Sequence, residues 1–315
     1  MLNHRRCLPL VLMCLLAGCA GLAGRSYPPL ADASVELADT PFYPQTRQHC
    51  GPAALATVLD VSGVAAPPDV LAPELFVPER GGTFQVELLS ATRRRDRLAV
   101  LIGADSASLV RQLQVGRPVL VLQNLGLSYL PAWHYAVVVG YNPRDDSFLL
   151  RSGTTKRFTM SRRRFESTWQ GGDRWGFVVL TPQQLPEGLE ETAYLESAAG
   201  LEATGHYESA LGAFDSALTV WPDALLAMLG RANNLYRLQR FSEAEAAYRA
   251  LLEVDPQHQI AAYNLITLLL EQQRPCSAAA VLAALDDPDA ALFADLAELG
   301  ELSGDSRKAA CAPAL

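Results

Sequence analysis

The feature that most constrains the fold is an internal repeat of 34 residues in the C-terminal part of the chain. The segment from about 189 to 303 is rich in Ala, Leu and Glu and has helical periodicity, so we expect stacked pairs of helices. Small alanines let two helices approach where they cross, and large side chains fill the space beside them. The recurring positions are Tyr207, Phe241 and Pro275; Ala210, Ala244 and Ala278; Phe214, Tyr248 and Leu282; and Pro222 and Pro256.

A helix–turn–helix unit with this period resembles the tetratricopeptide repeat (TPR). The resemblance implies an all-α TPR helical-repeat domain over 189–303 that recruits a protein substrate or partner, followed by a C-terminal tail over 304–315. Two repeats carry the full pattern, whereas the third keeps Ala278 and Leu282 but lacks the proline and the aromatic residue. Since about three repeats are near the minimum for a stable stack, we expect the array to lean on the preceding domain.

The N-terminus has the pattern of a secretory signal peptide. Arg5 and Arg6 precede an apolar run over 7–16, which spans about 15 Å as a helix and is too short for a bilayer core of about 30 Å. The run ends in Leu16-Ala17-Gly18-Cys19, which resembles a bacterial lipobox. This resemblance implies a lipoprotein signal peptide over 1–18 and acylation of Cys19. The alternative is an ordinary signal peptide cleaved nearby, with Cys19 incidental.

A lipid on Cys19 would make the membrane one partner of the protein. Ala20, rather than Asp, follows this cysteine, and in Gram-negative lipoproteins that pattern resembles outer-membrane sorting. We therefore expect an outer-membrane lipoprotein that faces the periplasm of a Gram-negative bacterium.

Between the signal and the repeats, helical and strand patterns are mixed. Small polar residues and prolines over 19–40 indicate a tether, and the prolines and glycine around 183–188 indicate a linker. The segment 41–182 is therefore expected to be an α+β domain. The expected helices span 50–60, 84–95 and 106–114, and the expected strands span 98–102, 118–123, 134–141, 147–151 and 175–180.

Charge separates the two halves. Residues 19–186 hold 17 basic and 14 acidic residues, whereas 187–315 hold 7 basic and 20 acidic residues. The net −13 of the repeat half suits basic peptides or simply solubility, and with a chain total of −8 it argues against nucleic acid as a partner. The arginine clusters over 93–97 and 162–164 are expected to be solvated or to contact the acidic half. No Cys/His cluster has metal-ligand spacing, so we expect no metal and no cofactor.

The segment with the spacing of a catalytic site begins a helix. In Cys50-Gly51-Pro52-Ala53, proline suits a first helical turn, so Cys50 lies at the helix N-terminus. There the helix dipole is expected to lower the pKa of its thiol, and Gly51 is expected to leave space for a substrate backbone. The alternative is a small buried cysteine that opens a core helix.

A cysteine nucleophile needs a base, most often histidine. After signal cleavage the candidates are His49, His134, His206 and His258. His206 and His258 fall at solvent positions of the repeats, and the side chain of His49 should point away from its neighbour Cys50. His134, which opens the apolar strand HYAVVVGY, is left as the base.

Together, Gln-x₄-Cys-Gly-Pro-Ala at 45–53 and His-Tyr-Ala-Val-Val-Val-Gly-Tyr at 134–141 resemble the papain-like cysteine peptidases that process bacteriocin precursors with double-glycine leaders. The resemblance covers 41–182 and implies an α+β papain-like peptidase domain. Members fused to an exporter remove leader peptides. This chain resembles the stand-alone lipoprotein branch that carries C-terminal TPR repeats.

The resemblance implies that Cys50 is the nucleophile, His134 the base and Gln45 the oxyanion donor, together with the backbone N–H of Cys50. Gln45 precedes Cys50 by five residues, whereas the usual spacing in the family is about six. Because the spacing of Gln45 does not match, Gln48 is a rival for this role. Ser152 occupies the position where the family usually has Asp to orient the imidazole.

This departure is compatible with a slower enzyme, a Cys-His dyad or a pseudo-enzyme. Serine accepts a hydrogen bond from histidine but has no charge with which to stabilise an imidazolium. Asp145 and Asp146 lie in a hairpin turn at the far end of the strand, and we expect them to be too distant to replace the missing carboxylate.

Cys276 and Cys311 are candidates for a disulfide in an oxidising compartment, a pairing that would leave Cys50 as the one unpartnered thiol. The sequence thus predicts a membrane-anchored periplasmic cysteine peptidase that hydrolyses a peptide or protein substrate. The first alternative is a catalytically degenerate scaffold that acts through its repeats. The second is a cell-wall amidase or transpeptidase, although the Asp-Cys-Ser motif usual in such hydrolases is absent.

Overall fold

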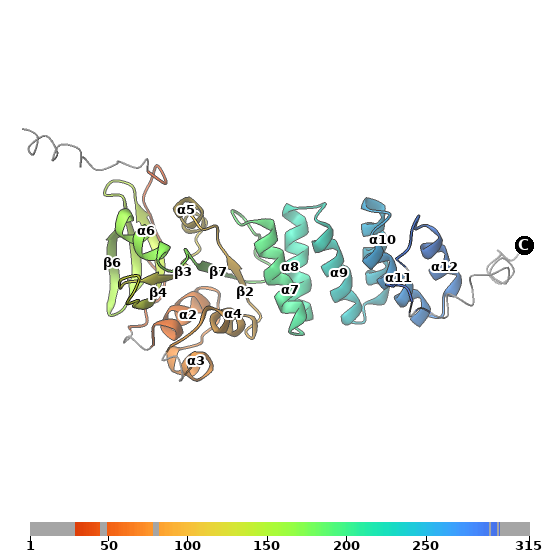
Figure 1. Ribbon diagram of the computed structural model, residues 1–315, viewed down its shortest axis with the longest axis horizontal. Coiled ribbons are helices and arrows are strands. Elements are labelled where there is room, and N and C mark those ends of the chain that lie inside the picture. The colour runs from red at the N-terminus through yellow and green to blue at the C-terminus, as the bar shows by residue number, and fades with distance from the viewer. Residues whose placement is uncertain (1–28, 45–48, 78–81, 290, 295, 297–315) are drawn as a thin grey trace, which may run out of the picture.

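The structure is a computed structural model that describes residues 29–44, 49–77, 82–289, 291–294 and 296. The predicted signal peptide, Cys19, Gln45, Gln48, Cys311 and the predicted tail lie outside the described residues. The chain forms an α+β domain followed by an all-α array, which confirms the predicted fold class (Figure 1).

The α+β domain is built on an antiparallel seven-stranded sheet with the order β2-β7-β3-β4-β5-β6, and β1 pairs with β4. Alternating residues of β4 face opposite sides: Tyr135 and Val137 belong to one core, and Ala136 and Val138 belong to the other. The strands are β1 (Val35–Glu36), β2 (Leu98–Leu101), β3 (Val119–Asn124), β4 (Trp133–Asn142), β5 (Ser147–Ser152), β6 (Thr155–Ser161) and β7 (Gly176–Leu180).

Helices cover both faces of this sheet. On one side lie α2 (Cys50–Val61), α3 (Pro68–Leu75) and α4 (Gln85–Arg93), whose apolar residues share a core with Tyr135 and Val137 (Figure 1). On the other side lie α5 (Ser106–Gln114) and α6 (Arg162–Gln170). All eight expected helices and strands of the domain are present; β1, α3, β6 and α6 were not expected.

The array keeps the predicted 34-residue period in its helix boundaries. Its helices are α7 (Glu191–Ala203), α8 (Tyr207–Val220), α9 (Leu225–Arg237), α10 (Phe241–Val254), α11 (Gln259–Glu271) and α12 (Pro275–Ala283). Ala210, Ala244 and Ala278 are fully buried, as expected for helix crossings. A methyl group at Gly230 would lie 2.4 Å from the ring of Phe214, so this helix contact requires a glycine.

The array leans on the first domain, as predicted. Tyr194, Leu195 and Ala198 of α7 belong to the same core as Val100 of β2 and Phe165 of α6. The predicted linker is held in place, because the guanidinium of Arg117 donates hydrogen bonds to the carbonyls of Leu185 and Glu187 at 2.5 and 2.8 Å.

The end of the predicted tether is also part of the domain. Val35 and Glu36 form β1 against β4, and Leu37 packs against both cores. The buried Arg151 donates hydrogen bonds to the carbonyls of Ala38 and Thr40. These contacts bind the segment to the sheet, because a buried guanidinium needs acceptors, and this backbone supplies them together with the carbonyl of Lys156.

Candidate active site

Cys50 opens α2, as predicted. Pro52 lies in the first turn, where its missing N–H costs no hydrogen bond, and His49 is the N-cap residue. Cys50 is half-buried, and it is a free thiol. Its side chain packs against the core beneath α2 and also meets backbone N–H groups.

His134 is the second residue of β4, at the same end of the sheet. The sulfur of Cys50 faces the backbone N–H groups of Tyr135, Gly51 and Cys50 itself. Because Tyr135 directly follows His134, the packing of α2 on β4 brings the predicted nucleophile beside the start of the strand that carries the predicted base.

Ser152 is the hydrogen-bond partner of the histidine. Nε2 of His134 lies 2.9 Å from Oγ of Ser152, which ends β5. Asp145 and Asp146 lie at the other end of that strand, where Asp146 accepts a hydrogen bond from the hydroxyl of Tyr141 and Asp145 accepts one from Asn142. Both carboxylates therefore have partners at the turn, at the end of β5 away from His134, as expected.

Burial sets the electrostatics of this pair. Burial lowers the pKa of the His134 imidazole, and no carboxylate of the described residues opposes that shift. Burial also raises the pKa of the Cys50 thiol and outweighs the three backbone N–H groups that lower it. The expected lowering at the helix N-terminus is therefore wrong in its net direction, because desolvation of the thiolate exceeds its stabilisation by the helix end. Both shifts favour a neutral thiol beside a neutral imidazole.

The space beside Gly51 is filled by the protein itself. A methyl group at Gly51 would lie 2.7 Å from Thr83, so this side chain occupies the place where we expected a substrate backbone. The hydroxyl of Tyr135 donates a hydrogen bond to the carbonyl of Thr83 at 3.1 Å, which fixes the segment there. Oγ1 of Thr83 is buried and has no hydrogen-bond partner among the described residues. The motif itself carries no signal for Thr83, which is about thirty residues away in sequence.

The other sequence candidates lie elsewhere. Nδ1 of His206 lies 2.8 Å from the carboxylate of Asp96, so this residue joins the two domains instead of facing only solvent. His258 is the N-cap of α11 and accepts a hydrogen bond from the N–H of Ala261. Cys276 is disulfide-bonded, while its predicted partner Cys311 lies outside the described residues, so their pairing stays a prediction.

The arginine clusters are mostly tied to their own domain. Arg94 and Arg95 both pair with Glu74 of α3. Arg93 instead packs against Gly200 of α7, in the repeat half. In the part of the chain that the structure describes, no group of acidic, Cys and His side chains is arranged to hold a metal ion, and no helix has the length and apolar character to cross a bilayer.

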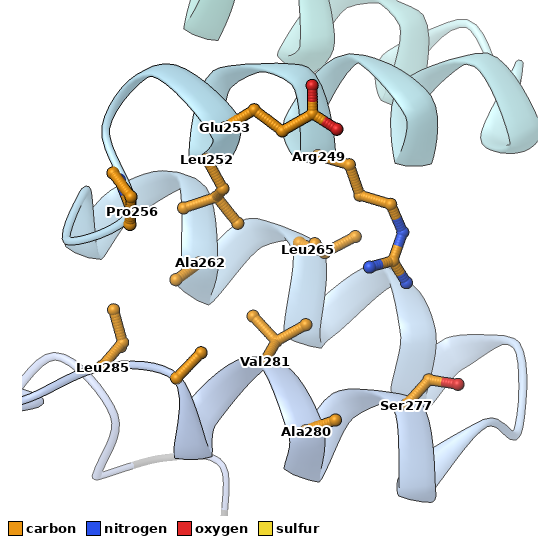
Figure 2. Close-up of a pocket in the computed structure, with 11 residues that line it drawn as sticks. Arg249, Leu252, Glu253, Pro256, Ala262, Leu265, Ser277, Ala280, Val281 and Leu285 are labelled. Carbon is orange, nitrogen blue, oxygen red and sulfur yellow. The ribbon is translucent and has the colours of Figure 1, made fainter.

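A hollow of about 450 Å³ lies near the other end of the molecule, between α10, α11 and α12 (Figure 2). Leu252, Leu265 and Val281 form its apolar walls, and Arg249 and Glu253 of α10 lie at its edge. It is separated from Cys50 by the length of the repeat array (Figure 1), so it belongs to the repeats rather than to the candidate active site.

Each of the two domains contains a segment that matches the model of a known protein family. Residues 37–173 match the model of the Peptidase_C39 like family, and residues 229–293 match that of the tetratricopeptide repeat. The first match covers most of the N-terminal α+β domain, which is therefore similar to C39-like peptidases. These matches confirm the predicted peptidase relationship and the predicted repeats.

Solved structures similar to the C39-like domain come from bacteria. One is a protein described as a C39-like peptidase from Bacillus anthracis, with 20% identity and a TM-score of 0.42 over 47% of this chain and 98% of that chain. The second is the peptidase domain of Streptococcus ComA, a bifunctional ABC transporter of a quorum-sensing pathway, with 22% identity and a TM-score of 0.37 over 45% of this chain and 98% of that chain. The third is the peptidase domain of Streptococcus mutans ComA, with 20% identity and a TM-score of 0.31 over 44% of this chain and 97% of that chain. No curated protein matches the chain.

Proposed function

We propose that this protein is a cysteine peptidase that hydrolyses peptide bonds through an acyl-enzyme on Cys50. The observation that carries the proposal is the arrangement at one end of the sheet. The Cys50 sulfur faces the N–H of Tyr135, and the neighbouring His134 is oriented by a 2.9 Å hydrogen bond to Ser152. A nucleophile, a base and an orienting group are the parts that thiol-dependent acyl transfer requires.

The hydrogen bond to Ser152 assigns the roles of the two imidazole nitrogens. When Nε2–H donates to Ser152, Nδ1 is left as the acceptor for the thiol proton. The thiolate attacks the carbonyl carbon of the peptide, and His134 returns the proton to the leaving amine. Water then attacks the thioester, with His134 again as base, and releases Cys50 and the acid product.

The oxyanion formed in each step needs hydrogen-bond donors. The backbone N–H of Cys50, at the free end of α2, is one such donor, and Gln45 is our proposed second donor, with Gln48 as its rival. A donor of this type is worth about 3–4 kcal/mol of transition-state stabilisation in related sites.

We further propose that the protein is a lipoprotein held to the outer membrane by acylated Cys19, with both domains in the periplasm. The lipobox-like sequence Leu16-Ala17-Gly18-Cys19 supports this location. A Cys19→Ser variant should move from the membrane fraction to the soluble fraction after cell breakage. Continued membrane attachment of that variant would contradict the lipid anchor.

The peptidase proposal is tested by cleavage of a complex substrate. We expect the full-length protein to cut a library of proteome-derived peptides, with new termini identified by mass spectrometry. The Cys50→Ser variant should make none of these cuts, while Cys276→Ser, which removes a cysteine outside the site, should retain them. Cuts that persist in Cys50→Ser, or no cuts by the wild type, would contradict the proposal.

The second candidate function is a scaffold that acts through its repeats. The observation that favours it is that His134 is oriented by an uncharged serine and its pKa is lowered by burial, so nothing in the described site stabilises an imidazolium. The two functions differ in one outcome, because a scaffold keeps its partner-dependent role in the Cys50→Ser variant whereas a peptidase loses it.

A further inference from the structure

The chain between β3 and β4 exposes a concentrated group of large apolar side chains. We call residues 125–133 the apolar hairpin. Its exposed side chains include Tyr129 at 81% and Leu130 at 70% of their full accessibility, together with Leu125, Leu127 and Trp133. Contiguous apolar surface of this kind marks interaction sites on soluble proteins.

The apolar hairpin is held in one shape by its own backbone. The side-chain oxygen of Asn124 accepts hydrogen bonds from the N–H groups of Gly126 and Ala132, each at 2.9 Å. Leu127 and Leu130 exchange two backbone hydrogen bonds of 3.1 Å. A methyl group at Gly126 would lie 2.4 Å from the carbonyl oxygen of Leu130, so the turn requires glycine. The backbone that carries the exposed side chains is therefore held in one conformation, which lowers the entropy cost of binding a partner.

The apolar hairpin leads directly into the candidate active site. Trp133 precedes His134, and the next residue, Tyr135, contacts the Cys50 sulfur through its backbone N–H. The other side of the Cys50–Gly51 corner is covered by Thr83, which is followed by the partly exposed Phe84. A chain bound at Cys50 would therefore have apolar protein surface close to it on both sides.

We propose that the apolar hairpin binds large apolar side chains of the peptide substrate next to the bond that is cut. The inference rests on the proposed peptidase function and names the residues that select its substrates: Leu127, Tyr129, Leu130 and Trp133. The fixed apolar side chains of the hairpin favour leucine-like and aromatic residues, because burial of such a side chain is the main free-energy gain available at this surface.

Two observations favour a peptide over a membrane as the occupant. Residues 125–133 contain no charged side chain, whereas segments that lie on membranes usually combine apolar residues with Lys or Arg. The segment that leads back to Cys19 also joins the domain at the opposite end of β4, where the N–H of Leu30 donates a hydrogen bond to the hydroxyl of Tyr141. The apolar hairpin is thus at the end of β4 remote from the proposed anchor.

The test measures binding in the absence of cleavage. Full-length protein with Cys50→Ala is applied to an array of immobilised peptides of varied sequence, and the bound sequences are compared with those of a second protein that also carries Leu127→Ser and Leu130→Ser. We expect the first protein to select peptides with Leu, Phe or similar residues, and the second to bind the same peptides about tenfold or more weakly. A matched control carries Leu226→Ser and Ile260→Ser, which remove equally exposed apolar side chains from α9 and α11 and should change nothing.

The outcomes show whether the apolar hairpin binds peptides, a membrane or neither. Equal binding by the hairpin variant and the control, or no selection of apolar peptides, would overturn the proposal. So would loss of binding to vesicles of phosphatidylethanolamine and phosphatidylglycerol in the hairpin variant with peptide binding unchanged, because that result assigns the surface to a membrane. Failure of the peptidase proposal is seen separately, as unchanged labelling of Cys50 by an electrophile when His134 is replaced.

Discussion

At the residue scale, the protonation state of the candidate active site depends on the residue that is hydrogen-bonded to His134. A serine at 2.9 Å orients the ring but carries no charge, and burial lowers the pKa of the imidazole. Burial also raises the pKa of the Cys50 thiol. Both directions favour a neutral resting pair, and in the proposed mechanism His134 takes the thiol proton during attack rather than holding a preformed ion pair.

Restoring a carboxylate should change this state. In Ser152→Asp, a negative charge beside the ring stabilises the imidazolium and raises the pKa of His134 by at least about one unit. We expect the rate of Cys50 alkylation by iodoacetamide at pH 7 to rise about tenfold, because more of the thiol is ionised in the pair. The matched variant Ser152→Asn, which is similar in size but uncharged, should not show this gain. Equal rates in the Asp and Asn variants would contradict the assigned role of Ser152.

The pH dependence follows from the direction of the His134 shift. A base must be unprotonated to act, and a lowered pKa keeps this imidazole neutral down to a pH below its ordinary value. We expect the acid limb of the pH–rate profile of peptide cleavage to have its midpoint below about pH 6.5. The Ser152→Asp variant should move that limb to higher pH. A wild-type midpoint above about 6.5 would contradict the lowered pKa of His134, because it would show that the imidazolium is stabilised.

At the element scale, the repeats show how much of the fold can be read from spacing. The starts of α8, α10 and α12, at Tyr207, Phe241 and Pro275, keep the predicted spacing of 34 residues. By contrast, α3 contains Pro73, α6 opens with three arginines, and β6 is a mostly exposed strand at the edge of the sheet. Their local sequences oppose or do not signal the observed structure, which depends on packing against the rest of the domain.

The candidate site was predicted where its residues share a local motif. Cys50 at a helix start and His134 at a strand start follow from sequence, and Ser152 follows from the family resemblance, which places Asp at the end of the strand after the histidine. The roles of Thr83 and the apolar hairpin could not be predicted from the sequence, because their place beside Cys50 depends on contacts between distant segments. The net pKa of Cys50 also depended on burial, which the helix-terminus argument did not include.

The contact between α8 and α9 offers a test of the repeat packing. Gly230→Ala gains up to about 1 kcal/mol of helix propensity, but its methyl group meets three ring atoms of Phe214 at 2.4–2.6 Å, and overpacking typically costs about 1–3 kcal/mol. We expect the clash to prevail, with a net loss of about 1 kcal/mol in the free energy of unfolding, measured by urea denaturation. The control Gly212→Ala meets only the flexible end of Gln183 and the side chain of Pro182 at 3.1 Å or more, and should be milder. A stabilised Gly230→Ala protein would contradict the packing described for this contact.

At the scale of the whole molecule, the two domains share a core. Tyr194 and Leu201 of α7 are buried with residues of the sheet, and Asp96 at the end of α4 accepts hydrogen bonds from His206 and Ser209 at the start of α8. The charge difference between the halves therefore coexists with an apolar junction. The first helix pair of the array acts as part of the peptidase domain and as the base of the repeats.

Truncation tests this shared core. A protein that ends at Pro186 loses α7 and exposes the sheet residues that it covers, so we expect it to aggregate or to unfold at a temperature lower by more than about 10 °C. A protein that ends at Asp223 keeps α7 and α8 and should retain a cooperative thermal transition. Equal thermal stability of the two proteins would show that the junction does not support the first domain.

The central claim is that Cys50 and His134 form a working nucleophile–base pair. The most direct measurement is the rate at which a peptidyl vinyl sulfone modifies Cys50, followed by mass spectrometry of the intact protein at pH 7. We expect the wild type to be labelled at Cys50, His258→Ala to be labelled at the same rate, and His134→Ala to be labelled at least about a hundredfold more slowly, because general-base assistance typically contributes 10²–10⁴-fold. Equal labelling of the wild type and His134→Ala, or no labelling of either, would show that His134 is not the base for Cys50.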